Sequence, residues 1–276
     1  MIAFSGHLRL RAQARADGRT QLAHQAFRAP FHLSKPYWDP ESRTLLVQVV
    51  NPTAGILAGD ALDAAVSVGG RAAVLLTTPS ASRVFRMREG LATCRQAFAI
   101  DAGGWLEFTP EPIVPHRGSR YRQTTTVEVE RGARGMFVEQ LMPGRVGHGE
   151  AWSWTQLELS CDLRVDGRLV LRERLQQSGE QLQALSAVFG ASAAACLATI
   201  ILVDTTPAFA PHPAWRGKVA ALHQPECQVG VSALSEGGWT IRLIADGPVR
   251  LRDTLARLRA VLADAYPELG ASFRRY

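Results

Sequence analysis

Lysine is nearly missing from this chain, as are several features that usually signal a function. Only Lys35 and Lys218 are lysines, so arginine carries almost all of the positive charge. The formal net charge of +6 suits an acidic partner or a nucleic acid. However, no aromatic residues interleave with basic ones in the manner of an RNA-recognition motif. We therefore expect no nucleic-acid partner.

Cysteine pairs and closely spaced histidines are also missing. The four cysteines lie far apart and form no CxxC pair, so neither a zinc site nor a disulfide framework is indicated. No two histidines have the i, i+4 spacing that brings two imidazoles to one metal on a helix. We expect buried free thiols and no tightly bound cofactor.

The sequence contains no recognisable catalytic or targeting motif. The P-loop, the dinucleotide fingerprint and the G-x-S-x-G elbow are absent, so the pattern does not favour an enzyme. The N-terminus has no apolar core of signal-peptide length. The longest apolar run, at 191–203, is too short to span a bilayer. These absences predict a cytoplasmic protein without membrane contact.

Period-two alternation between residues 45 and 175 is the main pattern that the sequence does contain, and it predicts strands and hairpins. A unit recurs in which two inward-facing apolar residues precede a glycine turn, roughly thirty residues apart. Because one strand pair cannot bury its apolar face, repeated pairs stack in layers. The repeated apolar pairs are Val66 and Val68, Phe98 and Ile100, Val127 and Val129, and Leu163 and Val165.

The last hundred residues follow a different pattern. The run at 196–204 predicts a buried strand, and residues 213–223, which begin with proline, predict a short helix. A hairpin is expected across residues 236–238. The clearest helix is 251–266, where Leu251, Leu255, Leu258, Val261 and Leu262 share one face.

The fold expected from these patterns is mostly β, a layered, β-helix-like stack of strands with about two flanking helices in the C-terminal third. An ordinary β-sandwich is the alternative. No flexible linker separates the two regions, so we expect a single domain over residues 1–276. Its β-rich body covers about residues 1–205, and its helix-containing flank covers about 206–276.

The stretch NPTAGILAGD at 51–60 resembles a phosphate-binding loop but lacks the lysine and the following helix that such a loop requires. Its two glycines predict a tight turn with close backbone packing. Asp60 belongs to a set of carboxylates near strand ends, any of which can serve acid/base chemistry or weak cation contact. The set is Asp60, Asp63, Glu107, Glu139, Glu150 and Glu173.

An ordered set of motifs resembles the urease accessory protein family UreD, also called UreH. The motifs cover about residues 6–176, and each of them is weak when taken alone. They are L-R-L followed by Arg19-Thr20, NPTAGILAGD, LTTPSASRVFRM, WLEFTPEPIVPHRGSRY, FVEQLMPGR with GHGE, and DGRLVLRERL. The chain departs from the family pattern at Ala54, where a glycine is usual, and at Phe108 and Thr109 in Leu-Glu-Phe-Thr-Pro.

The resemblance implies a scaffold that does not itself catalyse a reaction. Such a chaperone binds apo-urease, formed by the urease structural subunits, and the UreF–UreG complex, in which UreG is the GTPase. In that hetero-oligomeric assembly Ni²⁺ passes in transit to the urease active site through a polar internal channel. By motif position, the resemblance assigns the channel lining to Asp60, Asp63, Ser82, Glu139 and Glu173.

Two other functions remain open from the residues alone. A β-solenoid enzyme acting on acidic polysaccharides would use carboxylates and arginines clustered in a groove. An arginine-rich nucleic-acid binder would show an affinity that falls steeply with salt. A nickel-delivery scaffold instead predicts carboxylates spaced along a wet interior.

Overall fold

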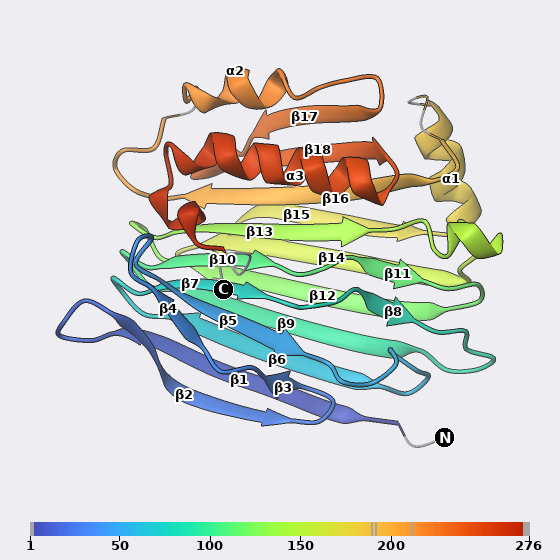
Figure 1. The fold of residues 1–276 in the computed structure, drawn as a ribbon, viewed down its shortest axis with the longest axis horizontal. Coiled ribbons are helices and arrows are strands. Elements are labelled where there is room, and N and C mark those ends of the chain that lie inside the picture. Colours follow the sequence, from blue (N-terminus) through green and yellow to red (C-terminus); the bar gives the residue numbers. More distant parts are fainter. Residues whose placement is uncertain (1–2, 189, 191, 211, 273–276) are drawn as a thin grey trace.

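Two β-sheets lie face to face, and helices cover the outer face of one of them (Figure 1). This architecture is seen in a computed structural model that describes residues 3–188, 190, 192–210 and 212–272. The first sheet has the order β15-β14-β12-β9-β6-β1-β2. Its strands are β1 (Ser5–Ala14), β2 (Thr20–Arg28), β6 (Ala61–Val68), β9 (Ala92–Ile100), β12 (Arg120–Val129), β14 (Gln156–Val165) and β15 (Arg168–Gln177).

The second sheet has the order β17-β18-β16-β13-β10-β7-β5-β3, with β4 beside β5 and the short β8 and β11 attached through β13. Between β5 and β14 the chain alternates between the two sheets. The strands of the second sheet are β3 (His32–Leu33), β4 (Tyr37–Asp39), β5 (Thr44–Val50), β7 (Ala73–Thr77), β8 (Ser82–Val84), β10 (Trp105–Thr109), β11 (Ile113–Pro115), β13 (Arg134–Leu141), β16 (Ala195–Asp204), β17 (Cys227–Ala233) and β18 (Gly238–Asp246).

The predicted layers are confirmed by the register of the first sheet. Neighbouring strands from β1 to β14 are parallel, and the repeated apolar residues stack on one another. One row joins Val66, Phe98, Val127 and Leu163, and the next joins Val68, Ile100, Val129 and Val165. All of these side chains are buried, and all except Val165 belong to the core cluster between the sheets.

The turns stack as well as the strands. Arg71 donates its backbone N–H to Gly103 O (3.1 Å), and Gly103 donates in the same way to Gly132 O (3.0 Å). The fourth repeat ends differently, because Asp166 and Gly167 both have positive φ, 47° and 76°. Two such residues favour a tight hairpin. The chain therefore turns back into β15 within the same sheet.

The helices are α1 (Gly179–Val188), α2 (Trp215–Ala220) and α3 (Pro248–Ala263), with 3₁₀ turns η1 (Val146–His148) and η2 (Pro267–Gly270). The predicted strand, short helix, hairpin and long helix of the C-terminal region are confirmed. In α3, Leu251, Leu258 and Leu262 are buried against the second sheet. No described helix is both long and apolar enough to cross a membrane.

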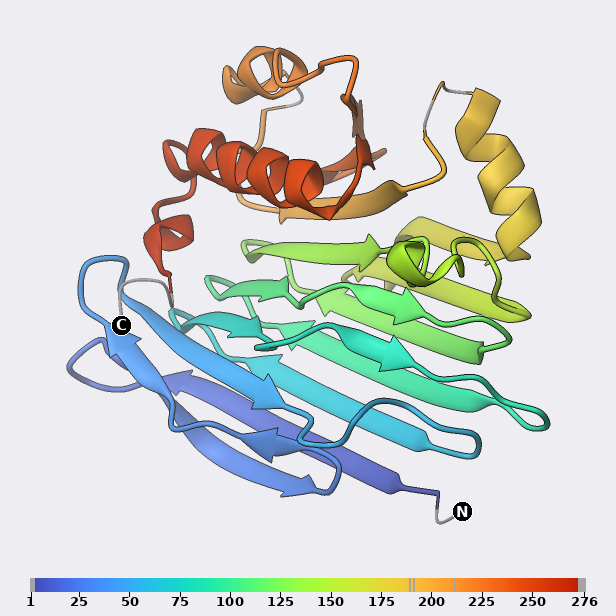
Figure 2. The same cartoon turned by 45° about the vertical axis from the view of Figure 1, so that its right-hand side comes forward.

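The sequence pattern did not predict helix α1. Figure 2 shows it at the end of the sheets, apart from α2 and α3. Among its described side chains only Leu182 is a buried apolar residue, while Leu185 and Val188 are exposed. With so little apolar periodicity, the segment gave no helical signal.

Candidate functional site: a cavity between the sheets

A cavity of about 660 Å³ lies between the two sheets at the end where α1 stands. Strands β9, β12, β14 and β15 of the first sheet form one wall, and β13, β16 and β18 of the second sheet form the other. Leu182 and Leu185 of α1 also line it. The space thus continues the core between the same strands, and its lining mixes polar side chains with apolar ones.

The polar part of the cavity lining arises where the inward-facing positions of a strand change character halfway along it, most clearly in β12. In β12 the inward residues are Tyr121, Gln123 and Thr125, followed by Val127 and Val129 at the apolar end. Buried polar groups need hydrogen-bond partners, and these side chains supply them to one another. Tyr121 Oη donates to Gln123 Oε1 (3.0 Å).

Glu139 of β13 points into the cavity from the second sheet. The amide Nε2 of Gln123 donates to Glu139 Oε2 (3.0 Å), which joins the two walls. Burial raises the pKa of the Glu139 carboxyl from 4.5 to about 7, the Gln123 hydrogen bond opposes this rise, and the negative charge of Glu173 adds to it. Near neutral pH this carboxyl therefore exchanges a proton readily.

Replacing Glu139 by glutamine is expected to stabilise the protein at pH 8 but not at pH 4. The folded state binds a proton on Glu139 more tightly than the unfolded chain, so wild-type stability falls as pH rises from 4.5 to about 7. The variant lacks this loss and should gain about 1–3 kcal/mol at pH 8. Urea unfolding at both pH values measures it, with the outward-facing Glu128→Gln as control. Equal gains at both pH values would contradict the assignment.

Glu173 of β15 lies opposite β18 and forms an ion pair with Arg242. Its register partner in β14 is Cys161, which also lines the cavity. Ser82, at the start of β8, lines the same cavity, and its backbone N–H donates to Pro112 O (2.9 Å). The structure thus brings together three of the five residues that the resemblance assigned to a channel.

Two thiols of the cavity are poor metal ligands in their resting state. Burial, aided by the charges of Glu139, Asp162 and Glu173, raises the pKa of Cys161 to about 12. Burial raises the pKa of Cys94 to about 11. Only the thiolate binds metal ions strongly. At neutral pH, therefore, oxygen atoms are the available donors in the cavity.

Asp60 and Asp63 are not among the residues that line this cavity. Asp60 is 3% exposed, and its two carboxylate oxygens accept the backbone N–H groups of Phe4 (2.8 Å) and Leu57 (2.9 Å). Asp63 is half exposed and pairs with Arg9 at 2.8 Å. Asp60 thus fastens the N-terminal strand to the turn before β6. A channel role for either residue stays a prediction.

Replacing Asp60 by alanine should lower the free energy of unfolding by about 2–4 kcal/mol, because two backbone donors lose their acceptors in a buried setting. Asp63→Ala is the matched control, since an exposed ion pair contributes at most about 1 kcal/mol. Urea denaturation compares the two variants. Equal losses would contradict the fastening role of Asp60.

The turn at residues 51–60 holds the chain against the next layer, as its glycines predicted. A Cβ on Gly55 would lie 2.6 Å from Arg83 O and 2.6 Å from a ring carbon of Phe85. Gly59 has a φ of +84°, which side-chain-bearing residues rarely adopt. The turn therefore positions β8, whose first residue is Ser82, rather than binding a phosphate.

The other singled-out polar residues have structural partners. Glu107 of β10 is buried and bound by Arg259, and Glu150 is bound by Arg145.

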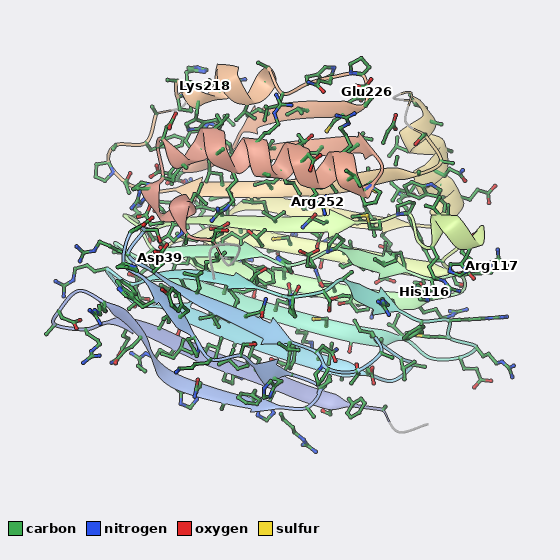
Figure 3. All side chains as sticks on the ribbon, viewed as in Figure 1. Asp39, His116, Arg117, Lys218, Glu226 and Arg252 are labelled. Carbon is green, nitrogen blue, oxygen red and sulfur yellow. The ribbon has the colours of Figure 1, made fainter. Side chains whose placement is uncertain are left out.

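His116 is 6% exposed, and its ring meets Phe85 edge to face. Burial and the charge of Arg145 lower its pKa. Figure 3 labels it just beyond β11. Across the described residues, no group of three or more His, Cys, Asp or Glu side chains is arranged to hold a metal ion.

Several cavity residues escaped the sequence analysis, although a signal for them existed. The alternation within β9 and β12 places Gln96, Gln123 and Thr125 in phase with the apolar core residues that follow. Polar residues at inward positions of a strand predict a polar interior. Arg242 gave no comparable signal. Its neighbours in β18 are buried, so the alternation of that strand predicts that the Arg242 side chain simply faces solvent.

Comparison with known proteins gives a consistent result. A family model described as UreD urease accessory protein matches residues 5–275, well beyond the range of the motifs. A urease accessory protein UreD from Opitutus terrae is 58% identical over 272 residues, 99% of each chain. A urease accessory protein UreD 2 from Streptomyces griseus is 30% identical over 247 residues, 85% of this chain and 81% of its own.

A shorter match is found in Yersinia enterocolitica, whose urease accessory protein UreD is 38% identical over 146 residues, 52% of this chain and 45% of its own. All three relatives are named as accessory proteins rather than as enzymes.

Proposed function

This chain belongs to the UreD family of urease accessory proteins, and we propose that it is a scaffold through which Ni²⁺ reaches apo-urease. In this proposal the chain binds the urease structural subunits on one side and the UreF–UreG complex on the other, in the cytoplasm. It catalyses no reaction itself, since GTP hydrolysis belongs to UreG. Nickel is cargo in transit, not a resident cofactor.

The cavity between the sheets is the observation that carries this proposal. Burying an unpaired divalent charge is very costly, so an ion that crosses a protein interior needs either full replacement of its water shell or a wet passage lined by oxygen donors. The cavity offers the carboxylates of Glu139 and Glu173, the hydroxyl of Ser82 and the amide of Gln123. Several weak sites let an ion enter and leave again, whereas one strong site would trap it.

The protonation of Glu139 fits such weak binding. A carboxyl with a pKa of about 7 gives up its proton when a cation arrives and regains it when the cation leaves. The cavity thus avoids a permanent buried charge between passages. Because its thiols keep their protons, the passage lacks the soft ligands that hold nickel tightly.

Genetic complementation tests the proposed function. Urease structural subunits and the other accessory proteins are expressed with or without this chain, and the nickel content of purified urease is measured by atomic absorption. We expect full loading only when the chain is present, together with its co-purification with urease and with UreF–UreG. Full loading without the chain would refute the proposal. Failure of the chain to bind either partner would refute the scaffold role.

A further inference from the structure

Along one side of the cavity the first sheet ends at β15, while the second continues through β18 to β17. Glu173 is on β15 and Arg242 is on β18, so their ion pair bridges the two sheets at this edge. The Arg242 side chain is 51% exposed and that of Glu173 is 27% exposed, and both line the cavity. The pair therefore stands between solvent and the interior.

The registers of the two sheets place the other polar residues behind this pair. On the second sheet, Arg242 pairs with Thr199, which pairs with Glu139. On the first sheet, Glu173 pairs with Cys161, which pairs with Thr125. Glu139 thus lies two strands inward from Arg242. An ion that reaches Glu139 from the edge first meets Glu173.

We propose that Arg242 is the gate of the cavity: its guanidinium occupies the Glu173 carboxylate at the edge, and a divalent cation enters by displacing it. This inference rests on the proposed nickel transit and deepens it. The Arg242 guanidinium and the cation bind the same carboxylate in turn. The negative charge of Glu173 is therefore balanced both when Arg242 is bound to it and when the cation has displaced Arg242. The neighbouring Arg174 is not the gate, because it is held by Asp162 at 2.9 Å.

The cysteines of the chain provide a direct probe of this gate. Cys161 lies behind the ion pair, while Cys196 and Cys227 pack in the core between the second sheet and the helices. The purified full chain is treated with N-ethylmaleimide, and each cysteine peptide is followed by mass spectrometry. In Arg242→Gln we expect Cys161 to react about three to five times faster, because an exposed ion pair no longer holds the edge closed. Cys196 and Cys227 should be unchanged.

Faster alkylation would report access rather than altered thiol chemistry. Removing a nearby cation raises the pKa of a thiol and slows its reaction, so the chemical effect of Arg242→Gln runs against the expected result. Arg242→Lys, which keeps the charge, should stay near the wild-type rate. Arg164→Gln, which removes an exposed ion pair with Glu128 on the outer face, is the matched control. Equal Cys161 rates in Arg242→Gln and wild type would overturn the gate.

Titration calorimetry with Ni²⁺ tests the displacement step. Arg242→Gln should bind Ni²⁺ about three to five times more tightly than wild type, because no guanidinium competes for Glu173. The double variant Arg242→Gln/Glu173→Gln should lose this gain, and unchanged affinity in Arg242→Gln would overturn displacement.

The gate and the transit function can fail separately. If both gate readouts behave as expected but the nickel loading of urease does not change in Glu139→Gln, the gate stands and the transit function fails. If loading depends on Glu139 but neither readout responds to Arg242, only the gate fails.

Discussion

Replacing Arg259 by methionine is expected to lower the free energy of unfolding by about 3–5 kcal/mol, because it leaves a buried carboxylate without its partner. Arg259 of α3 donates Nε and Nη2 to the two oxygens of Glu107, both at 2.8 Å, and Nη2 also donates to Ala271 O at 2.6 Å. The Glu107 side chain is only 1% exposed. The pair thus fixes the long helix to the second sheet.

Urea unfolding at pH 7 measures the loss, and Arg257→Met on the exposed side of the same helix is the control. The double variant Glu107→Leu/Arg259→Met should recover most of the stability, because removing both charges removes the unpaired one. A loss below about 1 kcal/mol in the single variant is typical of exposed ion pairs and would show that this one contributes little.

The second large effect is expected on nickel loading. Glu139→Gln keeps the size of the side chain and its hydrogen bond from Gln123. It removes the negative charge that Glu139 brings to the cavity. Loss of one carboxylate contact weakens the binding of a divalent ion at this point by at least about 1.4 kcal/mol, or tenfold in affinity. We expect urease co-expressed with this variant to contain about one tenth of the usual nickel at limiting supply.

Two comparisons make this result specific. Glu128→Gln, an equal change on the outer face of β12, should leave loading unchanged, and pull-downs should recover urease with both variants in equal amounts. Loading that is unaffected in Glu139→Gln while assembly is intact would remove the channel role. Loading that falls together with assembly would place the effect of Glu139 on docking instead.

The layered fold was predictable because one physical constraint repeats along the chain. Each of the four repeated strands of the first sheet buries the same two positions, so Val66, Phe98, Val127 and Leu163 fall into one row. The long helix was equally clear, since its leucines recur at helical spacing. Helix α1 was missed because Leu182 is its one buried apolar residue among those described, and such a helix depends on its position in the fold rather than on its own pattern.

The candidate site was only partly accessible from sequence. Motif position led to Ser82, Glu139 and Glu173, which share the cavity, but also to Asp60 and Asp63, which do not line it. A carboxylate that binds two backbone amides is not distinguishable in sequence from one that faces a cavity. Arg242 was beyond prediction because its partner lies in the other sheet, 69 residues away along the chain.

The two antiparallel strands that finish the first sheet have a consequence for self-association. Strands β1, β6, β9, β12 and β14 run parallel, whereas β2 and β15 run against them at either end. Strand β15 ends the first sheet and carries three arginines, and charged side chains on an edge strand oppose its pairing with a second molecule. Fibre growth through the β15 border is therefore disfavoured.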